Sequence, residues 1–184
     1  MKAKNITLVL IGLLFYMTDA NAQTRFYDTP RTFHEQGFTY VSRLMAGVLV
    51  QLHNQNNQWI NVPLANRDGT PLGHPIYSPG PPTVQIDNDV HMTQLARTIV
   101  RNAFSPAEMQ RIRGSRLGVS MYIDSNTGRV MGVRFTFAVD HGFATIPVST
   151  YRRIEVELMN RIQFIPTAEG RRRNFLFRSF DFEP

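Results

Sequence analysis

The stretch MYIDSNTGRVMGVRFTF, residues 121–137, decides the fold of the second half of this 184-residue chain. Apolar residues alternate with small or polar ones over 117–123 and again over 131–139, so each segment has one apolar face with a period of two. Asn126, Thr127 and Gly128 lie between the two segments, and these residue types favour the backbone angles of a tight turn. The stretch therefore predicts two antiparallel strands that are covered on one side.

Helical patterns lie on both sides of this hairpin. Over 92–103, apolar residues recur at three- and four-residue spacing, which predicts a helix with one buried stripe. Residues 105–108, Ser-Pro-Ala-Glu, combine a capping box with a proline at the first helical position and predict a short second helix. The same reasoning predicts a third helix over 147–164 and a last strand over 171–182.

The region before these elements has the composition of β-structure. Residues 38–44, 47–53 and 58–64 resemble strands, and the last two flank a run of four amide residues that predicts a hairpin. Residues 23–33 are polar with little periodicity and predict a loosely held arm. Trp59 falls on the outer face of the expected hairpin, where packing is a commoner role than ligand stacking.

The first 22 residues have the layout of a cleavable secretory signal, with two lysines, an apolar run over 6–17, and small residues before Gln23. A membrane-spanning helix needs roughly 20 apolar residues, so no integral membrane span is expected after processing. The chain contains no cysteine, which excludes a lipid-modified cysteine and a disulfide framework and fits a bacterial periplasm. We therefore expect a periplasmic or otherwise exported protein, cleaved near Ala22.

Proline marks one internal boundary. Three of the five residues over 78–82 are proline, which can continue neither a helix nor a central strand. The predicted organisation is therefore a signal peptide (1–22), a β-rich region (23–77), a proline-rich connector (78–90) and an α+β domain (91–184).

Charge bears on the class of partner. The net charge of the chain is +6, and both of its lysines lie in the signal, so arginine supplies all the positive side-chain charge beyond it. A basic surface suits nucleic acid, phosphate or acidic glycans, but export argues against nucleic acid.

No catalytic or metal-binding pattern stands out. Five histidines lie far apart, no serine sits in a G-x-S-x-G elbow, and no glycine-rich loop follows a strand. Acidic pairs occur at Asp87 and Asp89, assigned to a loop and helix cap, and at Glu155 and Glu157, assigned to a helix surface among arginines. The sequence therefore predicts a non-catalytic protein without cofactor or metal.

From about residue 91 to 182 the chain resembles the C-terminal domain of TonB, the periplasmic protein that contacts outer-membrane transporters. The resemblance rests on the YIDSNTGRV hairpin, the VRFTFAV strand, the helix ending in IQFIPTAEG and the FLFRSFDF strand. It implies an α+β fold in which a small three-stranded antiparallel sheet packs on helices, here preceded by a β-hairpin-rich region, and no enzymatic activity.

The chain also departs from TonB. TonB proteins have an uncleaved anchor and a long proline-rich spacer, whereas this chain has only SPGPP, so energy transduction is not expected. As a whole, the chain looks like a family of exported Bacteroides proteins of unknown function.

The last strand is the expected working surface. The resemblance implies that it is a sheet edge, whose exposed backbone is a template for a partner strand. Its apolar residues outnumber what one buried face requires, so some are exposed, or the strand is bulged, or the N-terminal region covers them. The candidate partner-binding residues are Arg171, Arg173, Phe175, Phe177 and Ser179.

Three functions are weighed. The first is binding of another protein or an extended peptide by strand addition, a homodimer included. The second is a binding module for cell-wall or surface glycan, which requires Trp59, Tyr77 or Tyr122 to lie exposed beside arginines. The third is a hydrolase, which requires His and Asp side chains to converge in one pocket. Under the first function, the arginines at 171–173 either steer an acidic segment into place or repel unwanted pairing; otherwise they belong to a solvated turn.

Overall fold

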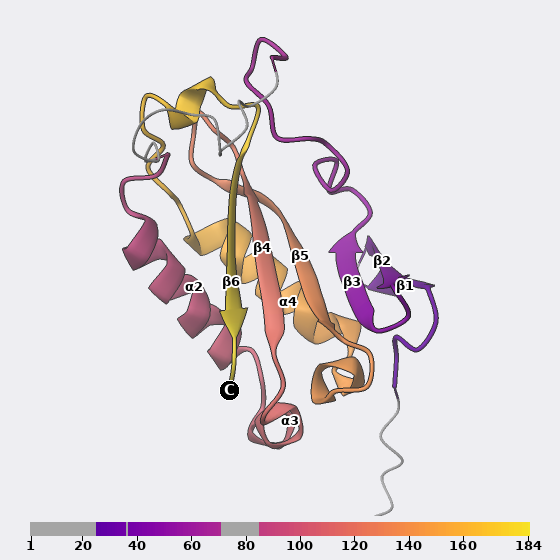
Figure 1. Ribbon diagram of the computed structural model, residues 1–184. Coiled ribbons are helices and arrows are strands. Elements are labelled where there is room, and N and C mark those ends of the chain that lie inside the picture. The colour runs from indigo at the N-terminus through magenta and orange to yellow at the C-terminus, as the bar shows by residue number, and fades with distance from the viewer. Residues whose placement is uncertain (1–24, 36, 71–84) are drawn as a thin grey trace, which may run out of the picture.

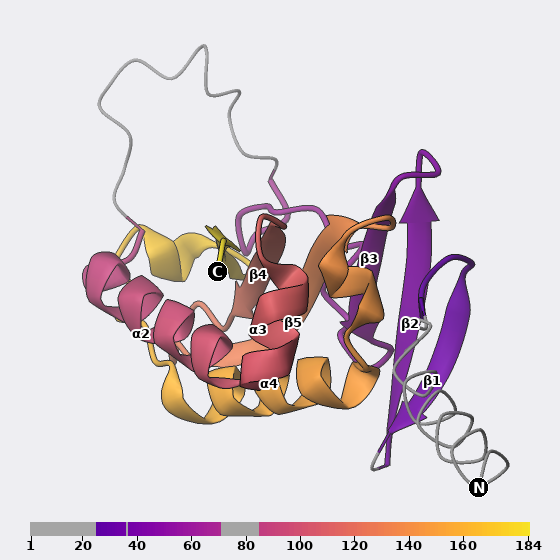
Figure 2. The same ribbon diagram turned by 90° about the horizontal axis from the view of Figure 1, so that it is seen from below.

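The computed structural model describes residues 25–35, 37–70 and 85–184. These residues form a six-stranded antiparallel sheet, with helices α2 and α4 on one of its faces (Figures 1 and 2). The strands are β1 (Arg31–Glu35), β2 (Phe38–Met45), β3 (Leu49–Asn54), β4 (Leu117–Ile123), β5 (Val130–Ala138) and β6 (Leu176–Phe182). The helices are α2 (Asp89–Asn102), α3 (Pro106–Ile112) and α4 (Val148–Arg161), with short 3₁₀ turns η2 (Gly142–Thr145) and η3 (Gly170–Arg172).

The prediction of a small three-stranded sheet is wrong, because the strand order is β1-β2-β3-β5-β4-β6. Strand β3 of the N-terminal region pairs with β5 of the central hairpin, with Val50 opposite Phe137 and Leu52 opposite Phe135. The open side of β5 thus receives a strand whose apolar alternation matches its own, and one buried face continues across both. The two regions share a single sheet.

The expected hairpin between residues 47–53 and 58–64 does not form. Strand β3 pairs with β2 instead, through a turn in which Ala46 (φ 48°) and Gly47 (φ 71°) both have positive φ. The backbone N–H of Val48 closes the turn onto the carbonyl of Met45 at 3.1 Å, and two successive positive φ angles are those of a type I′ turn. With β2 on one side of β3 and β5 on the other, no side is left for residues 58–64, which contain turns and irregular backbone.

The arm over 23–33 is ordered where the structure describes it, so the prediction of a loose arm is wrong there. Tyr27 is 1% exposed, and its hydroxyl donates to the carbonyl oxygen of Ile146 at 3.0 Å. Its ring packs edge-on against Phe137, with 5.3 Å between ring centroids. Strand β1 then begins at Arg31. One tyrosine in a polar stretch has no periodicity to reveal its burial.

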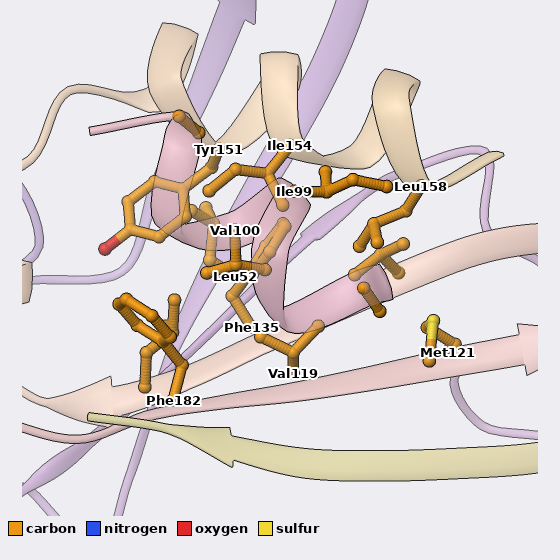
Figure 3. Close-up of a cluster of buried hydrophobic side chains, with 14 of the residues drawn as sticks. Leu52, Ile99, Val100, Val119, Met121, Phe135, Tyr151, Ile154, Leu158 and Phe182 are labelled. Atoms are coloured by element: carbon orange, nitrogen blue, oxygen red, sulfur yellow. The ribbon is translucent and has the colours of Figure 1, made fainter. Parts of the chain in front are cut away.

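The helices form as predicted, and their apolar stripes complete the core. In Figure 3, Tyr151 and Leu158 of α4 point toward Leu52 and Phe135 on the sheet. Tyr151 stacks almost parallel on Phe137, with 5.4 Å between centroids. The predicted capping box of α3 is confirmed: the Ser105 side chain accepts from the backbone N–H of Glu108, and the Glu108 carboxylate accepts from that of Ser105.

The central hairpin is also confirmed. The Asp124 carboxylate accepts from the backbone N–H of Thr127 at 2.7 Å and of Asn126 at 2.9 Å, and these bonds lower the pKa of Asp124. Gly128 follows with φ 72°, and its carbonyl accepts from the backbone N–H of Phe164 at 2.9 Å. The turn is thereby joined to the chain that leaves α4.

Three sequence predictions lie outside the described residues. They are the signal peptide (1–22), Tyr77 and the larger part of the connector, residues 78–84. Among the helices that are described, none has the length and apolar character to cross a membrane.

Substitution of Gly128 by alanine should destabilise the protein more than the same change at Gly69. Both glycines have positive φ, which costs about 1–2 kcal/mol for a residue with a Cβ. At Gly69 the Cβ meets open space, whereas at Gly128 it overlaps the Phe164 carbonyl. Urea unfolding of both variants measures the difference, and equal losses would contradict the close approach of turn and helix end.

Candidate functional site

Strand β6 is one of the two edges of the sheet, and β1 is the other. In the described part of the chain, β6 pairs with β4 alone, in a register that places Ser179 opposite Ser120. Figure 1 shows β6 as the outermost strand on the side of α2. The predicted last strand is therefore a sheet edge, but it begins at Leu176 and not at Arg171, because residues 170–172 form a 3₁₀ turn.

The backbone of β6 presents alternate residues to solvent. Arg97 of α2 donates to the carbonyl oxygen of Asp181, which fixes the direction of that peptide group as away from β4. In an antiparallel strand, the N–H and C=O of one residue point the same way, and those of residues two positions apart point alike. The main-chain groups of Phe177 and Ser179 therefore also face outward, and both residues are exposed.

The side chains of β6 divide between two environments. Leu176, Phe180 and Phe182 enter the core. Arg178 lies on the same face and makes an ion pair of 2.7 Å with Asp89 at the start of α2. On the other face, Phe177 remains 38% exposed. Helix α2 thus holds the strand from the core side without occupying the main-chain positions at Phe177 and Ser179.

Residues 63–67 lie along the approach to β6. The backbone N–H of Asn174 donates to the carbonyl of Ala65 at 3.0 Å, and the Asn174 amide donates to the carbonyl of Pro63 at 2.9 Å. The backbone N–H of Arg67 donates to the carbonyl of Arg172 at 2.8 Å. The N-terminal region therefore covers the segment before the edge strand, one of the alternatives that the sequence left open.

Aromatic side chains fill the space between this segment and the outer face of the sheet. The ring of Trp59 packs on Phe175 at 5.2 Å, Phe175 on Tyr122 at 5.7 Å, and Tyr122 on Phe177 at 5.4 Å. The expectation that Trp59 packs is confirmed. Burial raises the pKa of Tyr122, and the guanidinium of Arg134, 5.9 Å from its ring centroid, acts in the opposite direction.

A shallow pocket of about 250 Å³ opens beside these rings, between the covering segment and β6. Its lining is mostly apolar, and Phe177 forms the side that faces the free edge. Along the sheet beyond it, a second depression of about 380 Å³ has a floor of small residues and reaches Ser179 and Asp181. Both hollows adjoin the outward-facing main chain of β6.

The five candidate residues divide into two groups. The guanidinium of Arg173 binds Asn66 at 2.7 Å and Glu169 at 2.6 Å, and Phe175 is only 3% exposed, so these two belong to the interior. Arg171 is exposed and donates to the carbonyl of Asn126 at 3.4 Å. A partner can therefore touch three of the five candidates: Arg171, Phe177 and Ser179.

One acidic residue was assigned to the wrong environment. Glu155 is 1% exposed, not on a helix surface among arginines. It lies four residues after Tyr151 and three before Leu158, on the buried stripe of α4, so helical spacing alone could have placed it. Within the residues that the structure describes, no three His, Asp or Glu side chains form a group suited to a metal ion.

The comparisons with known proteins point to one family. The family model named DUF5043, a domain of unknown function, matches residues 23–180. The crystal structure of a DUF5043 family protein from Bacteroides uniformis ATCC 8492 superimposes with a TM-score of 0.77 and is 31% identical. That match covers 88% of this chain and 95% of the other. No curated protein matches, and a relation to TonB is not shown.

Replacement of Asn174 by alanine should loosen the contact between Trp59 and Phe175. The change removes the amide bonds to the carbonyl of Pro63 and the backbone N–H of Ala65, at about 1 kcal/mol each. Because Trp59 is the single tryptophan, its fluorescence should shift to longer wavelength. Asn126→Ala, an exposed control, should leave the emission unchanged. An unshifted spectrum in Asn174→Ala would contradict the role of Asn174.

Proposed function

Because the chain belongs to the DUF5043 family, whose members are domains of unknown function, we propose a function from its own geometry: it binds another polypeptide by strand addition to β6. The protein acts as an exported, non-catalytic binding protein. The observation that carries this proposal is the edge of β6, which no other described strand pairs with and where the main-chain groups of Phe177 and Ser179 face outward. An extended segment that pairs with these groups gains main-chain hydrogen bonds, and its side chains supply specificity.

Strand β6 is a better template than β1. Strand β1 has five residues, follows Pro30, and carries the charged or polar side chains of Arg31, His34 and Glu35. Short length, proline and charge are the features by which proteins protect sheet edges from pairing. Strand β6 has seven residues and shows a large aromatic side chain, Phe177, beside its free main chain.

The surroundings of β6 indicate the chemistry of the partner. The pocket of about 250 Å³ next to Phe177 is lined mainly by apolar side chains and suits one apolar side chain of an added strand. Arg171, which precedes β6 in the chain, is exposed, and the chain carries a net charge of +6. A basic surface attracts acidic partners at long range. The partner is therefore an extended segment with an apolar residue and acidic neighbours.

The N-terminal sequence bears on where the protein acts. Residues 1–22 carry the pattern of a cleavable signal, and the family match starts at residue 23, directly after the proposed cleavage site. We infer from this pattern that, in a bacterium with an outer membrane, the protein acts in the periplasm. The proposed binding mode is also suggested by the resemblance to TonB. That resemblance rests on the order of α2, the β4–β5 hairpin, α4 and β6 over residues 89–182.

Glycan binding at the aromatic residues is the second candidate function. Of the three aromatic residues considered for it, Trp59 is half-buried against Phe175 and Tyr122 is 3% exposed. Tyr77 lies outside the described residues. Neither Trp59 nor Tyr122 therefore presents a flat aromatic surface to a sugar ring. For this reason we rank strand addition above glycan binding at these residues.

A proline at position 179 should abolish partner binding. Extended ten-residue peptides are selected from a displayed library against the protein from Gln23 onward, and their dissociation constants are measured by calorimetry. Ser179→Pro removes an outward-facing N–H and blocks approach, so binding should weaken by at least about tenfold. Thr32→Pro makes the matched change on the free side of β1 and should leave binding unchanged.

Three results would contradict strand addition at β6. These are an equal loss in both variants, a loss confined to Thr32→Pro, or a library that yields no binder for the folded protein. Light scattering on the same samples detects self-association. A wild-type dimer that Ser179→Pro converts to a folded monomer would identify a second copy as the partner strand.

A further inference from the structure

A second candidate site lies away from β6, where β2, β3 and β5 face α4. Where β3 ends, the strand and the loop after it face α4 across a cavity of about 230 Å³. Strands β5 and β4 separate β3 from β6, so this cavity is distinct from the free edge. Its lining residues are Phe38, Asn54, Asn56, Asn57, Met131, Arg152, Glu155, Val156, Met159 and Asn160.

The carboxylate of Glu155 is the central polar group of the cavity. It is 1% exposed and receives three donors on one oxygen, Oε2. The Tyr40 hydroxyl donates to it, the Asn54 amide donates at 3.5 Å, and the Arg152 guanidinium donates at 3.3 Å. None of these three donors uses the other oxygen, Oε1. A buried carboxylate that lines a cavity with one oxygen unused has capacity for a ligand donor.

The charge of Glu155 is balanced within the site. Arg152 forms an ion pair with it, and the guanidinium carbon lies 3.3 Å from the centroid of the Phe38 ring. Burial, followed by the charge of Glu155, raises the pKa of Tyr40, so its phenol stays protonated and donates. One carboxylate and one guanidinium leave the lining with no net charge. A neutral lining favours neither a cation nor an anion.

Amides supply the remaining polar groups. Four asparagines line the cavity, and each side-chain amide both donates and accepts hydrogen bonds. Two of them, Asn56 and Asn160, are exposed and lie at the mouth of the cavity. Asn57 is 8% exposed, and its Nδ2 has no partner among the residues that the structure describes. The other walls are apolar, from Phe38, Val156 and two methionines.

We propose that this cavity binds a neutral, hydroxyl-rich ring, a single monosaccharide unit at the end of a glycan. A sugar ring offers hydroxyl donors for Oε1 of Glu155, hydroxyls that both donate and accept for the amides, and an apolar C–H face for Val156 and the methionines. The volume is below the roughly 300–1,000 Å³ of sites for drug-sized ligands, which limits the ligand to about one ring.

This inference goes beyond strand addition and uses none of its observations. A mutation at Ser179 should not affect sugar binding, and a mutation in the cavity should not affect peptide binding. The two proposals therefore succeed or fail separately.

The test is a titration of the ¹⁵N-labelled protein from Gln23 onward, followed by NMR. The probes are glucose, galactose and N-acetylglucosamine at millimolar concentration, with methylamine and acetate as a cation and an anion of smaller size. At least one sugar should cause saturable shifts at Asn54, Asn56 and Asn160. Asn160→Ala should weaken that sugar by at least about threefold, the loss expected for one neutral hydrogen bond. Asn102→Ala, an exposed position at the end of α2, is the matched control and should bind as wild type does.

A second variant tests the carboxylate itself. Glu155→Gln keeps the size of the side chain but removes its charge, and it should weaken the sugar by about tenfold while its amide spectrum stays that of a folded protein. The proposal is overturned if no sugar gives saturable shifts in the wild type, if methylamine or acetate binds at these residues more tightly than every sugar, or if Asn102→Ala weakens binding as much as Asn160→Ala.

Discussion

The pairing of β3 with β5 is the constraint on which the rest of the structure depends. It places Leu52 opposite Phe135 and joins the N-terminal region to the central hairpin in one sheet. On the inner face, both side chains then lie beneath the apolar stripe of α4 (Figure 3). Burial of such a continuous apolar surface is the main favourable term in folding. Neither region alone presents a face of this width.

The same pairing determines where the chain goes next. Residues that leave β3 cross the outer face of the sheet and arrive at the approach to β6, where Ala65 bonds with Asn174 and Trp59 packs on Phe175. This cover removes aromatic surface from water at the beginning of β6, but among the described residues it does not extend to Ser179, which is exposed. At the end of β3, Asn54 meets Glu155 of α4, which creates the polar cavity. Both candidate sites are therefore consequences of one strand pairing.

Local patterns in the sequence predicted local structure well. The turn at residues 126–128, the capping box of α3 and the apolar stripes of α2 and α4 depend on neighbours within a few positions, and each is present. Strand pairing could not be predicted in the same way, because the alternation of residues 47–53 fits more than one partner. The hydrogen bond of Glu155 with Tyr40, 115 positions away along the chain, and that of Arg173 with Asn66 could not be predicted either. Such distant partners leave no local signal in a single sequence.

Amide hydrogen exchange along β6 tests the central claim most directly. If the edge is free, the backbone N–H groups of Phe177 and Ser179 exchange much faster in the unbound protein than those of Arg178 and Phe180, which face β4. Residue-resolved NMR measures all four rates in one experiment. Slow exchange at all four positions would show that β6 already has a partner on its outer side, and a free edge could then not be the binding surface.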